Sequence, residues 1–145
     1  MKIVLDVNIL ICMLFNRQGF CGQAFFTAVD IGNILMSSKT FFEFLEICNS
    51  NLFLKFIPKK LQKKIIREIQ ENCTYIHINE QIFDCADQKL NNILELAICG
   101  KANTIISFNK KLLSPLNPYR GIKILSPIEF LESERQFWLK NAHVL

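Results

Sequence analysis

Short apolar runs along the chain alternate with longer segments that have helical character. The short runs are rich in β-branched and aliphatic residues, which is typical of buried strands. They comprise residues 2–6, 34–36, 74–78, 104–107 and 121–125. The longer segments are continuously apolar or repeat their apolar positions every three or four residues, as a helix packed on one face does. They comprise residues 9–15, 23–31, 41–48, 59–73, 82–99 and 128–135.

Residue types at the ends of the longer segments support the helical interpretation. Pro58 precedes a segment in which Leu61, Ile65 and Ile69 recur every four residues, and proline is well accommodated at the start of a helix. Ser126 is followed by a proline, which together form the cap and first-turn pair of a closing helix. These two starts bound the helices at 59–73 and 128–135.

The order of elements predicts a fold class. Most successive strands are separated by helices, which requires crossover connections and therefore a mostly parallel sheet with helices on both faces. We expect an α/β fold, a three-layer α/β/α sandwich with about five strands, in a single domain over residues 1–145. In such a sheet the binding crevice lies outside the carboxyl ends of the strands.

Composition excludes several protein classes. Half of the 145 residues are hydrophobic, 13 are phenylalanine, and the mean hydropathy is +0.22, which excludes a disordered chain. The longest fully apolar run, residues 9–15, is far shorter than a membrane span. The first ten residues carry an aspartate inside the apolar run, which is unlike a secretory signal. We therefore expect a cytoplasmic protein with no membrane partner.

Cysteine and histidine patterns do not predict a zinc site. The six cysteines are scattered without a C-x-x-C pair, and the two histidines are His77 and His143. Most of the cysteines fall on apolar positions of predicted helices, where a reduced thiol behaves as a small hydrophobic group. The chain also contains no G-x-S-x-G, P-loop or G-x-G-x-x-G motif, which removes common hydrolase and nucleotide-binding interpretations of an α/β sheet.

Two groups of basic residues could contact a polyanion. The net charge of +4 permits such a partner without requiring one. Five basic residues in segment 59–73 are better explained as the solvated face of a helix. Lys110 and Lys111 are the stronger candidates for nucleic-acid contacts, because they follow Asn109 at the expected edge of the crevice.

Acidic residues near strand ends carry most of the chemical information. Asp6 closes the first strand, with Asn8 just beyond it, and Glu43 lies one turn into the helix that follows the second strand. Asp84 and Asp87 lie near the start of the segment after the third strand. A group of carboxylates repels itself unless a cation neutralises it, and oxygen ligands are those preferred by Mg²⁺. Metal-assisted phosphodiester hydrolysis is the chemistry expected of such a group.

Each acid also has a purely structural explanation. Asp84 and Asp87 are well explained as helix caps or first-turn residues, and Glu43 as a solvated helix residue. Asp6 has the weakest structural explanation, because an acid inside an apolar run at a strand end rarely lacks a partner.

Several segments together resemble the PIN-domain family, most closely its branch of toxin components of toxin–antitoxin systems. KIVLDVNIL resembles the opening strand of the family with its Asp-x-Asn, and SSKTFFEFLEI its second acidic element. LNNILELAICGKANTIISFNKKLL resembles the following helix, strand and Asp-bearing loop, and GIKILSPIEFLE the closing strand and helix. The resemblance covers nearly the whole chain and implies Mg²⁺- or Mn²⁺-dependent cleavage of RNA by clustered acids.

The resemblance assigns two of the family's four acids and loses two. By position, Asp6 matches the first acid and Glu43 the second, whereas Leu90 and Asn109 stand where the third and fourth acids belong. Leucine cannot ligate a cation, and asparagine supplies an oxygen without the charge. Asp87 precedes Leu90 by three residues and could replace the third acid if the helix begins early.

Two functional hypotheses follow. In the first, the chain is an endoribonuclease of weak or lost activity, with Mg²⁺ or Mn²⁺ held by Asp6, Glu43 and Asp87, and with Asn8 and Asn109 as auxiliary polar groups. In the second, it is a non-catalytic PIN-like domain that binds single-stranded RNA or a protein, either an antitoxin or a second copy of itself. The retained acids favour the first hypothesis, and the two lost acids favour the second.

Overall fold

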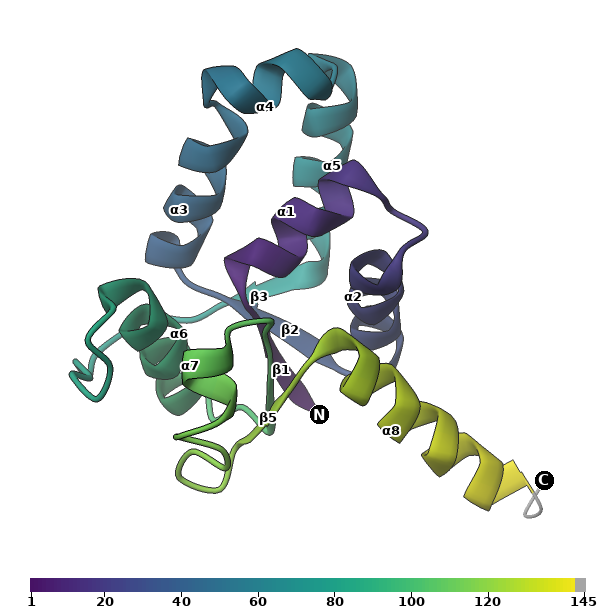
Figure 1. Ribbon diagram of the computed structural model, residues 1–145, viewed down its shortest axis with the longest axis vertical. Helices are drawn as coiled ribbons and strands as arrows, with labels where there is room; N and C mark the ends of the chain where they lie inside the picture. The colour runs from purple at the N-terminus through teal and green to yellow at the C-terminus, as the bar shows by residue number, and fades with distance from the viewer. Residues whose placement is uncertain (143–145) are drawn as a thin grey trace.

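A five-stranded parallel sheet forms the centre of the computed structural model, which describes residues 1–142 (Figure 1). The strands are β1 Lys2–Leu5, β2 Asn33–Met36, β3 Cys73–Tyr75, β4 Thr104–Ile106 and β5 Lys123–Leu125. They pair in the order β3-β2-β1-β4-β5, and every neighbouring pair is parallel. Ile3 in central β1 pairs with Ile34 on one side and with Thr104 on the other.

Helices cover both faces of this sheet, which confirms the predicted three-layer α/β/α architecture. The helices are α1 Val7–Phe15, α2 Phe20–Ile31, α3 Ser38–Cys48, α4 Asn51–Phe56, α5 Lys59–Asn72, α6 Gln88–Cys99, α7 Lys110–Leu113 and α8 Pro127–Asn141. Figure 1 shows α3, α4 and α5 rising at one end of the molecule, with α6 and α7 on one side and α8 on the other.

Alternating side chains of the strands divide the interior into two cores. Ile3 and Leu5 pack with residues of α1, α2 and α3, whereas Val4 between them packs with residues of α6. This alternation follows from the pleat of a strand, which sends successive side chains to opposite faces. Because β1 is buried on both faces, it has the continuous apolar sequence seen in Ile3, Val4 and Leu5.

Several boundaries differ from the sequence prediction. The helix predicted over 82–99 begins only at Gln88, and residues 76–87 form an irregular segment. The closing helix runs to Asn141 instead of residue 135. The predicted strands at 74–78 and 121–125 are shorter, as β3 and β5. Two short helices, α4 and α7, were not predicted, because runs of six and four residues are too short to establish a periodicity.

The cysteines depart in part from the expectation of core thiols. All six are free, as expected, and Cys21 and Cys48 are buried. Cys12 is exposed and the other three are half-buried. Burial raises the pKa of the Cys48 thiol to about 11, which keeps it in the inert thiol form.

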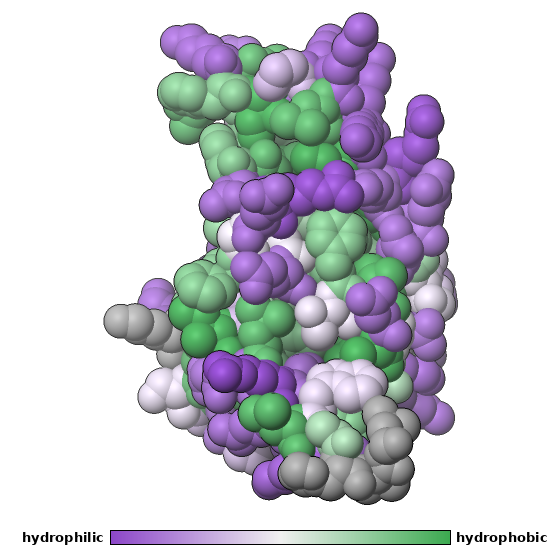
Figure 2. Space-filling model, turned by 90° about the vertical axis from the view of Figure 1, so that its right-hand side faces the viewer, coloured by the Kyte–Doolittle hydropathy of each residue, from purple (hydrophilic) through white to green (hydrophobic). Residues whose placement is uncertain are grey.

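The surface is not uniformly polar. Figure 2 shows hydrophobic residues at the surface of the end where α4 lies, and Leu52, Leu54 and Phe56 of that helix are exposed. Phe137 and Trp138 near the end of α8 are exposed as well. Within residues 1–142, no helix is both long and apolar enough to span a bilayer.

Candidate functional site

Asp6 lies at the carboxyl end of β1, where the crevice was predicted, and it is buried. Its backbone N–H donates to the carbonyl of Ile106, 2.9 Å away, which extends the pairing of β1 with β4 by one residue. Its carboxylate caps α1 by accepting a hydrogen bond from the N–H of Asn8 at 3.2 Å. The second carboxylate oxygen accepts a hydrogen bond from Ser107 Oγ at 2.7 Å. The expected partner of this buried acid is therefore a serine that directly follows the neighbouring strand β4.

The electrostatic environment of Asp6 favours its protonated form. Burial raises the pKa of the Asp6 carboxyl group above its ordinary value, and the negative charge of Asp87 adds to this rise. The hydrogen bonds from Ser107 and from backbone N–H groups lower the pKa but do not cancel the effect of burial. The carboxylate is thus held in a place where its charge is poorly solvated.

Ser107 links Asp6 to the next segment and was missed as a site residue by sequence reasoning. It is fully buried at the end of the β4 run, where the sequence prediction placed it in a strand. Its hydroxyl oxygen also accepts a hydrogen bond from the N–H of Asn109 at 3.0 Å. A polar residue that ends an apolar strand next to a predicted crevice is the signal that could have identified it.

Asn109, which the sequence resemblance matches to the family's fourth acid, acts as a helix cap. Its side-chain oxygen accepts a hydrogen bond from the N–H of Lys111 at 3.0 Å, at the start of α7. Because the Oδ1 atom is engaged by the backbone, the amide has a structural role already.

Glu43 lies one turn into α3, as predicted, and its side chain is only 17% exposed. Burial raises the pKa of its carboxyl group, and the charges of Asp6 and Asp87 raise it further. Lys89 opposes this rise, because its Nζ atom lies 3.8 Å from Glu43 Oε1. The mutual repulsion among Asp6, Glu43 and Asp87 indicates that the three acids face the same edge of the sheet.

Asp87 precedes α6 and does not belong to it. Its side chain caps the helix by accepting a hydrogen bond from the N–H of Lys89 at 2.9 Å. The capping explanation considered for this acid is therefore confirmed. The early helix start that would have placed Asp87 on the same helical face as Leu90 does not occur, because α6 begins at Gln88.

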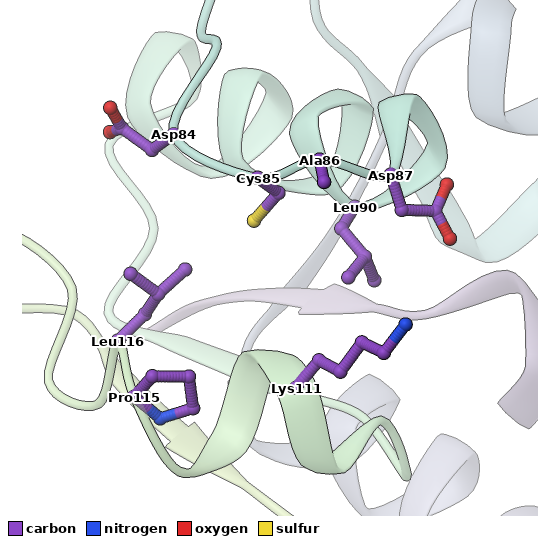
Figure 3. A pocket seen from close by; sticks show the side chains of 8 residues that line it. All are labelled: Asp84, Cys85, Ala86, Asp87, Leu90, Lys111, Pro115 and Leu116. Atoms are coloured by element: carbon purple, nitrogen blue, oxygen red, sulfur yellow. The ribbon is translucent and has the colours of Figure 1, made fainter.

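Leu90, which the sequence resemblance matches to the third family acid, lines a small pocket. It is 4% exposed and packs with the core formed by α6 and the second face of the sheet. The pocket has a volume of about 240 Å³. Figure 3 shows Leu90 directed into this pocket above Lys111, with Pro115 and Leu116 at its other end. Leu90 thus presents an apolar side chain to a pocket that Asp87 and Lys111 also line.

The remaining predicted residues occupy less central places. Asn8 is exposed on the first turn of α1. Lys111 lines the pocket, whereas the side chain of Lys110 lies outside the part of the chain that the structure describes. Asp84 lies at one end of the pocket, and Figure 3 shows its carboxylate directed away from it. That carboxylate accepts a hydrogen bond from the Tyr119 hydroxyl, and its Oδ2 atom lies 3.7 Å from Nη2 of Arg120.

Two buried polar residues of α6 that the sequence reasoning missed hold segment 76–87 in place. Asn91, 2% exposed, accepts from the N–H of Cys85 at 2.8 Å and donates to its carbonyl at 2.9 Å. Glu95 is 1% exposed, and its Oε1 atom accepts a hydrogen bond from the N–H of Ile82 at 3.0 Å. Its Oε2 atom lies 3.7 Å from Nζ of Lys39. These contacts set the path that ends in Asp87.

The acids do not make a resident metal site as they lie. Among residues 1–142, no group of three or more histidine, cysteine, aspartate or glutamate side chains is arranged to hold a metal ion. Asp6 is engaged by Ser107, Glu43 by Lys89, and Asp87 by the backbone of α6. Within the described part of the chain, these acids thus do not converge on one point as the oxygen ligands of Mg²⁺ do.

Comparisons with known proteins identify the fold family. A family model described as "PIN domain" matches residues 2–111. Among solved structures, the chain is similar to a chain of the VapBC2 complex from Rickettsia felis, which was crystallised bound to a DNA fragment from its promoter. The match has a TM-score of 0.59 and 13% sequence identity, and it covers 86% of this chain and 97% of the other. A comparison with curated protein sequences found no match.

Proposed function

The chain belongs to the PIN-domain family, and on that basis we propose that it is a toxin-type PIN protein with a degenerate acidic site, in which Mg²⁺- or Mn²⁺-dependent cleavage of RNA is weak or lost. The observation that carries the proposal is Leu90, an apolar and buried residue at the position of the third family acid. Its neighbours Lys89 and Asp87 already have partners within the chain. A metal ion would have to compete with these contacts for the same acids.

We further propose that the protein acts through binding. The similar VapBC2 structure is a toxin–antitoxin complex, which supports an antitoxin protein as a partner of this chain. Single-stranded RNA is the second proposed partner, with Lys110 and Lys111 as its phosphate contacts beside the pocket. Formation of a homodimer remains a prediction.

Cleavage of a mixed single-stranded RNA with Mn²⁺ or with EDTA tests the first proposal. The wild type and Asp6→Asn are expected to cleave equally little, because Asp6 does not belong to a group of three or more acidic, histidine or cysteine side chains among residues 1–142 that could hold an ion. Asp30→Asn serves as the matched control, since Asp30 is an exposed acid on α2. Strong Mn²⁺-dependent cleavage by the wild type and Asp30→Asn, but not by Asp6→Asn, would show an active nuclease.

A further inference from the structure

Two consecutive residues in the first turn of α6, Lys89 and Leu90, are unfavourable for binding a metal ion. Leu90 removes a carboxylate from the position where the third acid belongs, and Lys89 adds a positive charge beside it. The Lys89 side chain is 68% exposed and extends towards α3, where its Nζ atom lies 3.8 Å from Glu43 Oε1. The backbone N–H of the same lysine donates to Asp87 Oδ1 at 2.9 Å. Lys89 therefore contacts two of the three acids of the edge.

Something must offset the charge of these acids. Glu43 is mostly buried, and Asp6 is 5% exposed, so water screens their repulsion poorly. A site that binds Mg²⁺ solves this problem with the ion itself. Here the positive charge nearest to Glu43 comes from the chain, and Lys111 brings a second ammonium group to the opposite side of the pocket (Figure 3).

We propose that Lys89 takes the electrostatic place of a divalent cation at this edge of the sheet: its ammonium group holds Glu43, and together with Leu90 it excludes the metal. The proposal rests on the degenerate site proposed above and identifies the residue that keeps the metal out. The acidic edge is then neutralised without an external ion. Folding and partner binding should consequently be insensitive to EDTA.

The test measures Mn²⁺ binding to the full chain by calorimetry and by the shift in Tm that Mn²⁺ causes. The variants are wild type, Lys89→Met, Lys89→Met with Glu43→Gln, and Lys64→Met. Lys64→Met is the matched control, because it removes the same charge from an exposed position of α5. Methionine retains the helix propensity of lysine, so Lys89→Met should fold normally.

Lys89→Met should bind Mn²⁺ about two- to fivefold more tightly than the wild type, because a positive charge that water partly screens is removed from beside the ion and Glu43 is released. The gain should disappear when Glu43→Gln is added, and Lys64→Met should behave as the wild type. Equal affinity of Lys89→Met and wild type would overturn the inference, as would an equal gain in Lys64→Met or a gain that survives Glu43→Gln.

Different results would contradict the role of Lys89 and the proposed function. Mn²⁺-dependent RNA cleavage by the wild type contradicts the degenerate site directly. An inactive wild type together with a Lys89→Met variant that still binds no Mn²⁺ contradicts only the role of Lys89, and it would assign the loss of metal binding to Leu90 and Asn109 instead.

Discussion

At Asp6, the stability of the fold conflicts with the presence of an ionised carboxylate. The carboxylate is buried, and its pKa is raised because its charge is removed from water. An asparagine could still accept the hydrogen bond from the N–H of Asn8 through its Oδ1 atom, and its Nδ2 atom would donate to Ser107 Oγ in place of the bond that the carboxylate now accepts, without carrying a charge. The ionised acid therefore makes the folded state less stable than an uncharged residue would at neutral pH.

Asp6→Asn should raise the Tm at neutral pH, by the equivalent of roughly 1 kcal/mol. The carboxyl group has a higher pKa folded than unfolded, so its protonated form favours folding at low pH, and this advantage is lost as the pH rises above the ordinary value of 3.8 and through the raised pKa. The difference in Tm between variant and wild type should accordingly be small below pH 3.8 and reach a plateau above the raised pKa.

Thermal unfolding monitored by circular dichroism between acidic and neutral pH measures this difference. Asp30→Asn, on the exposed surface of α2, controls for the loss of one negative charge and should leave the Tm nearly unchanged. A Tm of Asp6→Asn below that of the wild type at neutral pH would mean that hydrogen bonds of the carboxylate outweigh its desolvation.

Residue-level prediction from the sequence succeeded where the local pattern was sufficient. Asp6 stood out because it interrupts an apolar run, and Glu43 because it follows a strand by one helical turn. Ser107 was missed because serine is common at strand ends, and its role depends on Asp6, which is 101 residues away in sequence. The partner of Glu43 was likewise hidden, since Lys89 belongs to a different helix.

At the scale of elements, α6 does more than cover the sheet. Asn91 and Glu95 lie one turn apart on the helix, and both side chains bond to the backbone of segment 76–87. These bonds replace the secondary structure that the segment lacks, and they explain why the helix predicted from residue 82 begins at Gln88. Periodicity in the sequence could not reveal this, because it does not distinguish a helical turn from a segment bonded to a neighbouring helix.

Asn91→Ala should destabilise the protein by about 1–3 kcal/mol, because the N–H and carbonyl of Cys85 lose their partners. Hydrogen exchange should also become faster in residues 82–87. Asn92→Ala is the matched control, since Asn92 makes one side-chain contact with exposed Gln88. Denaturant unfolding and hydrogen exchange measure both effects, and equal effects of the two variants would argue against the anchoring role.

At the scale of the whole molecule, the distribution of charge and apolar surface shapes the choice of partner. The net charge of +4 is modest, so RNA binding would depend on a few well-placed contacts rather than on overall charge. Exposed apolar residues lie on α4 and near the end of α8, and also next to these contacts in the chain, where Phe83 and Phe108 are exposed. The surface near Lys111 is therefore both basic and apolar.

Lys111→Ala should weaken binding of single-stranded RNA, and the salt dependence of log K should lose about 0.7 in slope for the lost phosphate contact. Lys64→Ala on the outer face of α5 provides the comparison, and its slope should match that of the wild type. Fluorescence anisotropy at several salt concentrations in EDTA measures the slopes. Identical slopes for all three proteins would exclude Lys111 as a phosphate contact.

The sequence by itself determined the fold class, the order of most elements and the family, because periodicity and short motifs are local properties of the chain. The resemblance to that family also predicted that Leu90 and Asn109 stand where two of its acids belong. Only the tertiary structure decided what the remaining acids contact. Ser107 and Lys89 approach Asp6 and Glu43 from other elements, and such long-range contacts depend on how the strands and helices are packed together.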